Sequence, residues 1–243
     1  NELLKSNINI SSNRQSGYLE YSQDINNLSL RAGTRSSFWS YNEELLVSPR
    51  ASLAYAPNWE KDVVFRLASG IYYQSPFYRE LRYPNGELNQ EIKSQKSVHY
   101  VAGSDYLFYK WGRPFKWITE IYYKKLENLI PYKVDNVRIQ YLAENNSKGY
   151  ATGIDFKING EFVSGVESWA SLSIMQTEED IIGDSYVDSE GITIYPGYIP
   201  RPTDQRVNFS LFFQDYIPRN MNYKMHLNMI YGSGLPFGPP KSE

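Results

Sequence analysis

The two histidines are the side chains best suited to acid–base chemistry near neutral pH, and they stand far apart in the chain. His99 and His226 are separated by more than half of the sequence, and neither lies beside a nucleophile motif. The sequence contains no glycine-rich phosphate loop, zinc signature or nucleophile elbow, and it has no cysteine. We therefore expect a protein that is not an enzyme, with no catalytic residue, no metal ligand and no cofactor.

An acidic run is the one constellation that suggests a cation. Its carboxylates are Glu178, Glu179, Asp180, Asp184, Asp188 and Glu190. Their spacing differs from the Asp-x-Asp-x-Asp-Gly pattern of an EF-hand calcium loop. A solvated acidic loop is the expectation here.

Composition narrows the class of protein. The chain has 243 residues, of which 41% are hydrophobic and 21% charged, with a formal net charge of −2. The charge shows no basic excess, so nucleic acid is not an expected partner. Aromatic residues make up 16%, including 22 tyrosines, which suit surfaces that are apolar on one side and wet on the other. The sequence shows neither a spanning apolar segment nor a signal peptide.

Alternation of apolar and polar residues dominates the sequence and predicts β-strands. From Tyr150 to Ile158 every second residue is apolar or aromatic apart from Thr152, while the intervening positions include Asp155 and Lys157. The same pattern recurs at 65–74, 206–214 and 222–229. Such strands have one apolar and one polar face. A mean hydropathy of −0.54 is compatible with a membrane barrel, because alternation hides the lipid-facing half.

About eleven strands are predicted, and many are long enough to cross a membrane when tilted. They are expected near residues 3–12, 16–24, 27–38, 46–57, 62–76, 94–108, 115–130, 147–161, 167–179, 203–216 and 222–233. The fold class is all-β, an antiparallel meander.

The connections alternate between short and long. Short turns are predicted at 25–26, 58–61, 109–114, 162–166 and 217–221, and long loops at 39–45, 77–93, 131–146 and 180–203. A meander places successive connections at opposite ends, so all turns should lie at one end and all loops at the other. Outer-membrane barrels have this asymmetry. Aromatic residues also gather around the short turns, as in the girdle at a membrane interface.

Several segments, in this order and spacing, resemble the barrel of TonB-dependent outer-membrane receptors. They are residues 48–55 (SPRASLAY), 72–80 (YYQSPFYRE), 93–97 (KSQKS), 120–130 (EIYYKKLENLI), 144–155 (ENNSKGYATGID) and 202–208 (PTDQRVN). The resemblance covers about residues 45–240.

The resemblance implies the rest of the expected biology. Members of this family have a 22-stranded transmembrane barrel closed by a plug domain, and they take up metal chelates, cobalamin or oligomeric nutrients with energy delivered through TonB. We expect residues 1–243 to be a fragment of such a barrel domain, without the plug, located in the bacterial outer membrane. The implied partners are outer-membrane lipid, a bulky solute, and the TonB system through the missing plug region.

Two sets of candidate site residues follow. Charged residues on the polar side of the strands are expected to face the lumen, where they would hydrate the channel or meet the plug: Arg50, Arg66, Asp105, Glu120, Lys124, Asp155, Lys157, Glu161 and Arg206. Aromatic and arginine side chains in one long loop are candidates for contact with solute, because these residue types are common at recognition surfaces: Phe77, Tyr78, Arg79, Arg82 and Tyr83.

Two alternatives stay open. One is a passive or structural outer-membrane barrel, such as a porin or an assembly platform. The other is a secreted β-sandwich that binds glycans or proteins, in which case the apolar faces would be buried between two packed sheets.

Overall fold

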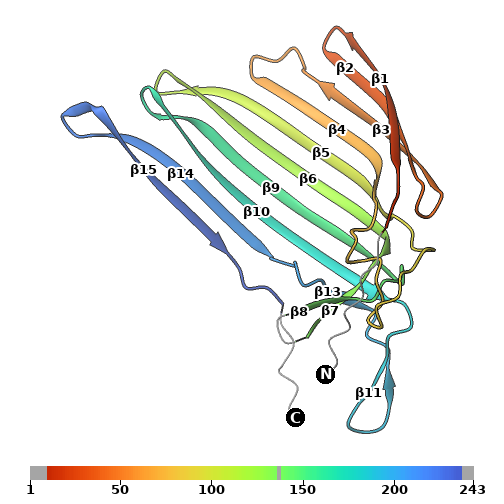
Figure 1. Ribbon diagram of the computed structural model, residues 1–243. Helices are drawn as coiled ribbons and strands as arrows, with labels where there is room; N and C mark the ends of the chain where they lie inside the picture. The colour runs from red at the N-terminus through yellow and green to blue at the C-terminus, as the bar shows by residue number, and fades with distance from the viewer. Residues whose placement is uncertain (1–9, 136–137, 237–243) are drawn as a thin grey trace.

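Ten long antiparallel strands, in unbroken chain order, form one curved sheet (Figure 1). The computed structural model describes residues 10–135 and 138–236. The strands are β1 (Arg14–Ile25), β2 (Leu28–Trp39), β3 (Glu44–Tyr55), β4 (Asp62–Gln74), β5 (Gln95–Lys110), β6 (Arg113–Leu129), β9 (Ser147–Val163), β10 (Val166–Ile181), β14 (Val207–Ile217) and β15 (Asn220–Gly232). Among the described residues, no helix is long and apolar enough to span a membrane.

The predicted all-β meander is confirmed, and ten of its strands match observed ones. The remaining prediction, at 3–12, falls largely outside the described residues, and residues 10–12 are not in a strand. The loops also contain short strands that were not predicted. They are β7 (Tyr132–Asp135), β8 (Arg138–Tyr141), β11 (Tyr186–Val187), β12 (Thr193–Ile194) and β13 (Tyr198–Pro200), the last of which pairs with β10.

The sheet has an apolar face and a polar face. Strand register places one apolar residue from each of six consecutive strands in a single cross-strand row: Leu53, Leu67, Ala102, Ile121, Ile154 and Ile174. This row is open, since Leu67 and Ile121 are each 55% exposed. In the part of the chain that the structure describes, no second large sheet covers this face. The β-sandwich alternative is therefore wrong.

Turns and loops are segregated to opposite ends of the sheet, as the sequence predicts (Figure 1). At the turn end, four of the five connections are two residues long and reverse the chain with left-handed backbone, as at Trp111 (φ 55°) and Gly112 (φ 70°), while the β3–β4 connection spans 56–61. Left-handed residues suit such hairpins because their twist matches that of the strands. At the loop end lie the other four connections: 40–43, 75–94, 130–146 and 182–206. The last three are long, whereas the connection predicted as a long loop at 39–45 has only four residues.

Aromatic side chains cluster on the apolar face beside the turns. Phe115 is 3% exposed, packs edge-to-face against Phe162 at 5.0 Å between ring centroids, and stacks on Phe108 at 5.6 Å. Tyr106 stacks in turn on Phe108. By register, these rings share the face of Ile121 and Ile154. The aromatic girdle expected from the sequence is thus a packed cluster at one edge of the apolar band.

Three of the loop-end connections pack together around a small hydrophobic core. Trp39, Leu81, Ile92 and Ile130 are each no more than 5% exposed and are in mutual contact. They come from the end of β2, from both ends of the β4–β5 connection, and from the start of the β6–β9 connection. We call the assembly of residues 40–43, 75–94, 130–135 and 138–146 the loop cap.

Candidate functional site

Asparagine side chains bind the loop cap together. The Asn145 side chain accepts a hydrogen bond from Lys93 N (2.7 Å) and donates to Lys93 O (2.9 Å) and Asn128 O (2.8 Å). Asn89 donates to Ala143 O (2.8 Å), and Asn42 donates to Ile92 O (2.7 Å). Each bond joins segments distant in the sequence, so the cap is one ordered unit and its surface residues have defined positions.

One turn of the cap is held by a buried carboxylate. Glu80 is 6% exposed, its N–H donates to Phe77 O (2.9 Å), and its side chain accepts from Phe77 N (2.8 Å). Gln95 also donates to this carboxylate, at 3.4 Å. Burial raises the pKa of Glu80 above its usual value, and the hydrogen bonds from Phe77 and Gln95 only partly offset this.

The structure divides the five loop candidates into two groups. Phe77 and Tyr78 are 62% and 65% exposed, and Arg79 is also exposed. These three project from the turn that Glu80 and the buried Leu81 anchor. Arg82 and Tyr83 are half-buried because they begin a tight hairpin, in which Arg82 bridges to Leu88 and Tyr83 N donates to Glu87 O.

The polar face gathers most of the other candidates. Strand register aligns Arg66, Gly103, Glu120, Asp155 and Ser173 in one row across five strands. Lys157 lies on the same face two residues further along β9, and its ammonium sits 5.6 Å from the centroid of the Trp169 ring. The Ser173 hydroxyl donates to Asp155. Alternation in the sequence places these side chains on one face of each strand, and the continuous register between strands aligns them in a row.

Asp105 is a largely buried charge on this face. Its carboxylate forms ion pairs with Arg66 (2.6 Å) and with Lys116 (2.7 Å), and its side chain is 13% exposed. One carboxylate therefore neutralises two cations from neighbouring strands. Lys116 was not among the candidates from the sequence, although its parity on β6 is that of Glu120.

Arg206 lies apart from the other four main lumen candidates, Arg66, Glu120, Asp155 and Lys157. Its guanidinium lies 2.7 Å from Asp204 and 3.7 Å from Glu178. Glu178 in turn accepts a hydrogen bond from the hydroxyl of Tyr150 (2.7 Å), which lies on the same side of β9 as Ile154. Asp204, whose side chain is 2% exposed, also accepts from Thr177 N (2.7 Å), so Arg206 helps to fix the return of the 182–206 connection onto β10.

The two histidines and the acidic run, which suggest chemistry in the sequence, make packing and ion-pair contacts in the structure. His99 packs on the ring of Tyr72, and His226 on that of Phe212. Within the acidic run, Glu179 pairs with Arg201, Asp180 pairs with Lys148, and Asp188 accepts hydrogen bonds from the backbone of its own turn. Over residues 10–135 and 138–236, no three acidic or histidine side chains are placed to hold a metal ion.

Comparison with known proteins agrees with this geometry. The family described as TonB dependent receptor-like, beta-barrel matches residues 4–224. Among curated proteins, no sequence matches the chain. Two solved structures share the fold. The alcaligin outer-membrane receptor FauA from Bordetella pertussis is 17% identical with a TM-score of 0.59, and the match covers 91% of this chain and 37% of FauA.

The second is the outer-membrane transporter YddB from Escherichia coli, which is 13% identical with a TM-score of 0.59; the match covers 91% of this chain and 38% of YddB. The chain thus spans less than two fifths of each solved receptor. The family match extends over most of the sequence, and the meander, the apolar face and the segregated loops are what a barrel of this kind requires. The chain belongs to the TonB-dependent receptor β-barrel family of the bacterial outer membrane.

Proposed function

We propose that this chain is part of the barrel domain of a receptor that takes up a bulky, scarce solute across the outer membrane with energy from TonB. The solute classes we expect are a metal chelate, cobalamin or an oligomeric nutrient. Contact with TonB would be made through the plug domain of the receptor.

The loop cap is the observation that carries this proposal. A general pore needs no ordered surface at its mouth, whereas recognition of a large solute needs side chains at fixed positions. The cap supplies them, because Phe77, Tyr78 and Arg79 project from a turn anchored by buried Glu80 and Leu81. Exposed aromatic and guanidinium groups on an anchored turn are efficient recognition groups, because little backbone freedom remains to be lost on binding.

The polar face has a supporting role in the proposal. Arg66, Glu120, Asp155 and Lys157 carry both signs of charge, and Asp105 pairs with Arg66 on the same face. Such a surface suits contact with water or with the polar surface of a plug, and we assign it to the lumen.

The test uses the full-length receptor that contains this chain, expressed in cells with and without TonB. The probes are radiolabelled ferric chelates, cyanocobalamin and a maltooligosaccharide series. We expect accumulation of one probe class only when TonB is present, and at least a tenfold loss of binding in a Tyr78→Ala, Arg79→Ala double variant.

Arg219→Ala, in a turn at the opposite end of the sheet, is the matched control and should bind like the parent. Uptake that is equal without TonB, and that falls smoothly with solute size, would instead establish a passive barrel. Normal binding by the double variant would remove the turn at 77–80 from the recognition surface.

A further inference from the structure

β3 and β4 pair over only part of their length, and an opening separates them towards the loop end. Their ladder runs from Tyr55 opposite Phe65 to Arg50 opposite Gly70 and stops there. Beyond it, residues 44–49 of β3 stay paired with β2, and residues 71–74 of β4 stay paired with β5. The gap is therefore local to this one seam, because both strands remain ordered by their outer neighbours.

The opening is bounded on its far side as well. The Glu44 carboxylate accepts from Ser94 N (3.0 Å) and from the Ser94 hydroxyl (2.5 Å), and that hydroxyl lies 3.4 Å from the Ser75 hydroxyl. These contacts reconnect β3 with the segment that follows β4. The result is a window in the sheet, closed by a backbone ladder at one end and by the loop cap at the other.

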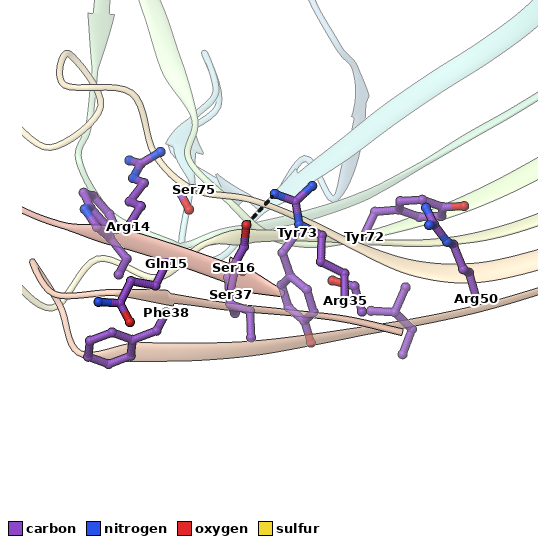
Figure 2. Close-up of a pocket in the computed structure, with 14 residues that line it drawn as sticks. Arg14, Gln15, Ser16, Arg35, Ser37, Phe38, Arg50, Tyr72, Tyr73 and Ser75 are labelled. Carbon is purple, nitrogen blue, oxygen red and sulfur yellow. Dashed lines mark hydrogen bonds between the residues drawn. The ribbon is translucent and has the colours of Figure 1, made fainter. Parts of the chain in front are cut away.

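A cavity of about 370 Å³ occupies this window (Figure 2). On the polar face it is lined by Arg14, Arg35, Arg50 and Tyr72, which rise on one side of the sheet in Figure 2, while Phe38 lies on the other. Ile71 and Tyr73, which share the apolar parity, also line it. The cavity thus joins a cationic side to an apolar side through the thickness of the sheet.

In the described part of the chain, only one of the three arginines on the cationic side is paired with a carboxylate. Three arginines and no carboxylate line the cavity. Arg50 reaches Glu20, outside the lining, at 3.2 Å. Among the described residues, Arg35 has only the Ser16 hydroxyl (3.2 Å), and Arg14 lies over the Trp39 ring at 4.3 Å, with no acidic partner for either. Arg35 and Arg50 are diagonal neighbours, because Arg35 lies opposite Ser48 in the register of β2 and β3. Neighbouring guanidinium groups attract a phosphate or carboxylate, which they bind in a forked geometry.

We propose that the window between β3 and β4 is a binding site for a membrane amphiphile with an anionic headgroup. The phosphate or carboxylate lies beside Arg35 and Arg50, and the acyl chain runs out over Phe38, Ile71 and Tyr73 onto the apolar face. A free anion would use only the arginines, and a neutral lipid only the apolar side. The combination of both surfaces in one cavity favours a molecule that carries both. This site is separate from the solute-binding turn at 77–80.

The experiment measures binding of dodecyl phosphate to the full-length receptor in dodecyl maltoside by native mass spectrometry. Inorganic phosphate is the probe for a free-anion site, and retained dodecyl maltoside reports a purely apolar groove. We expect one bound dodecyl phosphate, bound at least tenfold more tightly than inorganic phosphate and more weakly as salt is raised.

Arg35→Gln should weaken this binding at least tenfold. Arg31→Gln is the matched control, since Arg31 is exposed on the same face of β2 but does not line the cavity. Phe38→Ser tests the apolar side. It should weaken the binding of dodecyl phosphate and leave the binding of inorganic phosphate unchanged. The proposal is overturned if inorganic phosphate or dodecyl maltoside binds as tightly as dodecyl phosphate, or if none of the three binds. It is also overturned if Arg31→Gln weakens the binding of dodecyl phosphate as much as Arg35→Gln does.

Discussion

The Phe115 ring on β6 lies directly over Gly160 on β9, and a Cβ added to that glycine would come within 2.6 Å of the ring. The two residues are register partners on the apolar face. Glycine is therefore required at 160 by the close approach of an aromatic ring, with no demand on its backbone angles. The same pairing places Phe115 against Phe162, so the aromatic cluster beside the turns depends on it.

Replacing Gly160 by valine should destabilise the barrel. The new side chain must displace Phe115, which is 3% exposed, at an expected cost of about 1–3 kcal/mol in the free energy of unfolding. Gly17→Val is the control, because no atom lies within 4 Å of a Cβ at that position in β1. The unfolding temperature of the full-length receptor, followed by its heat-dependent gel mobility, should fall for Gly160→Val alone.

Asp105→Asn should also lower stability. The substitution keeps the shape of the side chain but removes the charge that Arg66 and Lys116 share, so two cations on the strands either side of β5 lose their common counter-ion. Leaving largely buried polar groups without their charged partner predicts a decrease of about 1–3 kcal/mol in the free energy of unfolding. Asp24→Asn, an exposed carboxylate on β1, should be neutral. Equal effects of the two substitutions in urea titrations would contradict this account of Asp105.

The turn at 77–80 should become more rigid as the pH falls. Burial raises the pKa of Glu80, so the stabilisation is complete below the pKa of the unfolded chain and is lost as the pH rises through the higher folded-state pKa. A spin label on Arg79→Cys should be less mobile at about pH 5 than at about pH 8. Glu80→Gln should abolish the difference, whereas Glu87→Gln, on an exposed side chain, should preserve it. A label that loosens on acidification would show that the charged form holds the turn.

The loop end should face the outside of the cell and the turn end the periplasm. Because the chain has no cysteine, single cysteines at Asn85, Ser189 and Asn220 report on each end without a background reaction. An impermeant thiol reagent on intact cells should label the first two positions and leave Asn220 unmodified. Labelling of Asn220 alone would reverse the orientation, and equal labelling at all three would mean that the chain is not held in a membrane.

Strand positions were predictable because alternation and connection length are local properties of the sequence. The alternation of residues within each strand predicted that Arg66, Glu120 and Asp155 share the polar face, and the continuous register between strands aligns them in one row. At the turns the strands extend beyond the predicted bounds: β5 ends at Lys110 and β6 begins at Arg113, whereas the predicted turn spans 109–114. The left-handed residues at 111 and 112 allow the chain to reverse in two residues.

The loop cap could not be predicted in the same way. Leu81, Ile92 and Ile130 lie in segments without periodicity, and their burial results from contacts with one another across long separations. The burial of Glu80, the bridging position of Asn145 and the half-buried state of Arg82 and Tyr83 all depend on those contacts. Arg206 was assigned by parity, but ion pairing at the end of a loop determined its position.

The shared core of the loop cap limits how this surface can be engineered or can diverge. A graft that exchanges only residues 75–94 for the loop of another receptor removes Leu81 and Ile92 and leaves Trp39 and Ile130 without their partners. The backbone hydrogen bonds that Asn145 makes to Lys93 would still tether the ends, but the apolar contacts beneath would be lost. If the turn at 77–80 contacts solute as we propose, new specificity is reached most readily by substituting the three exposed positions 77, 78 and 79, or by transplanting all three segments of the cap as one module.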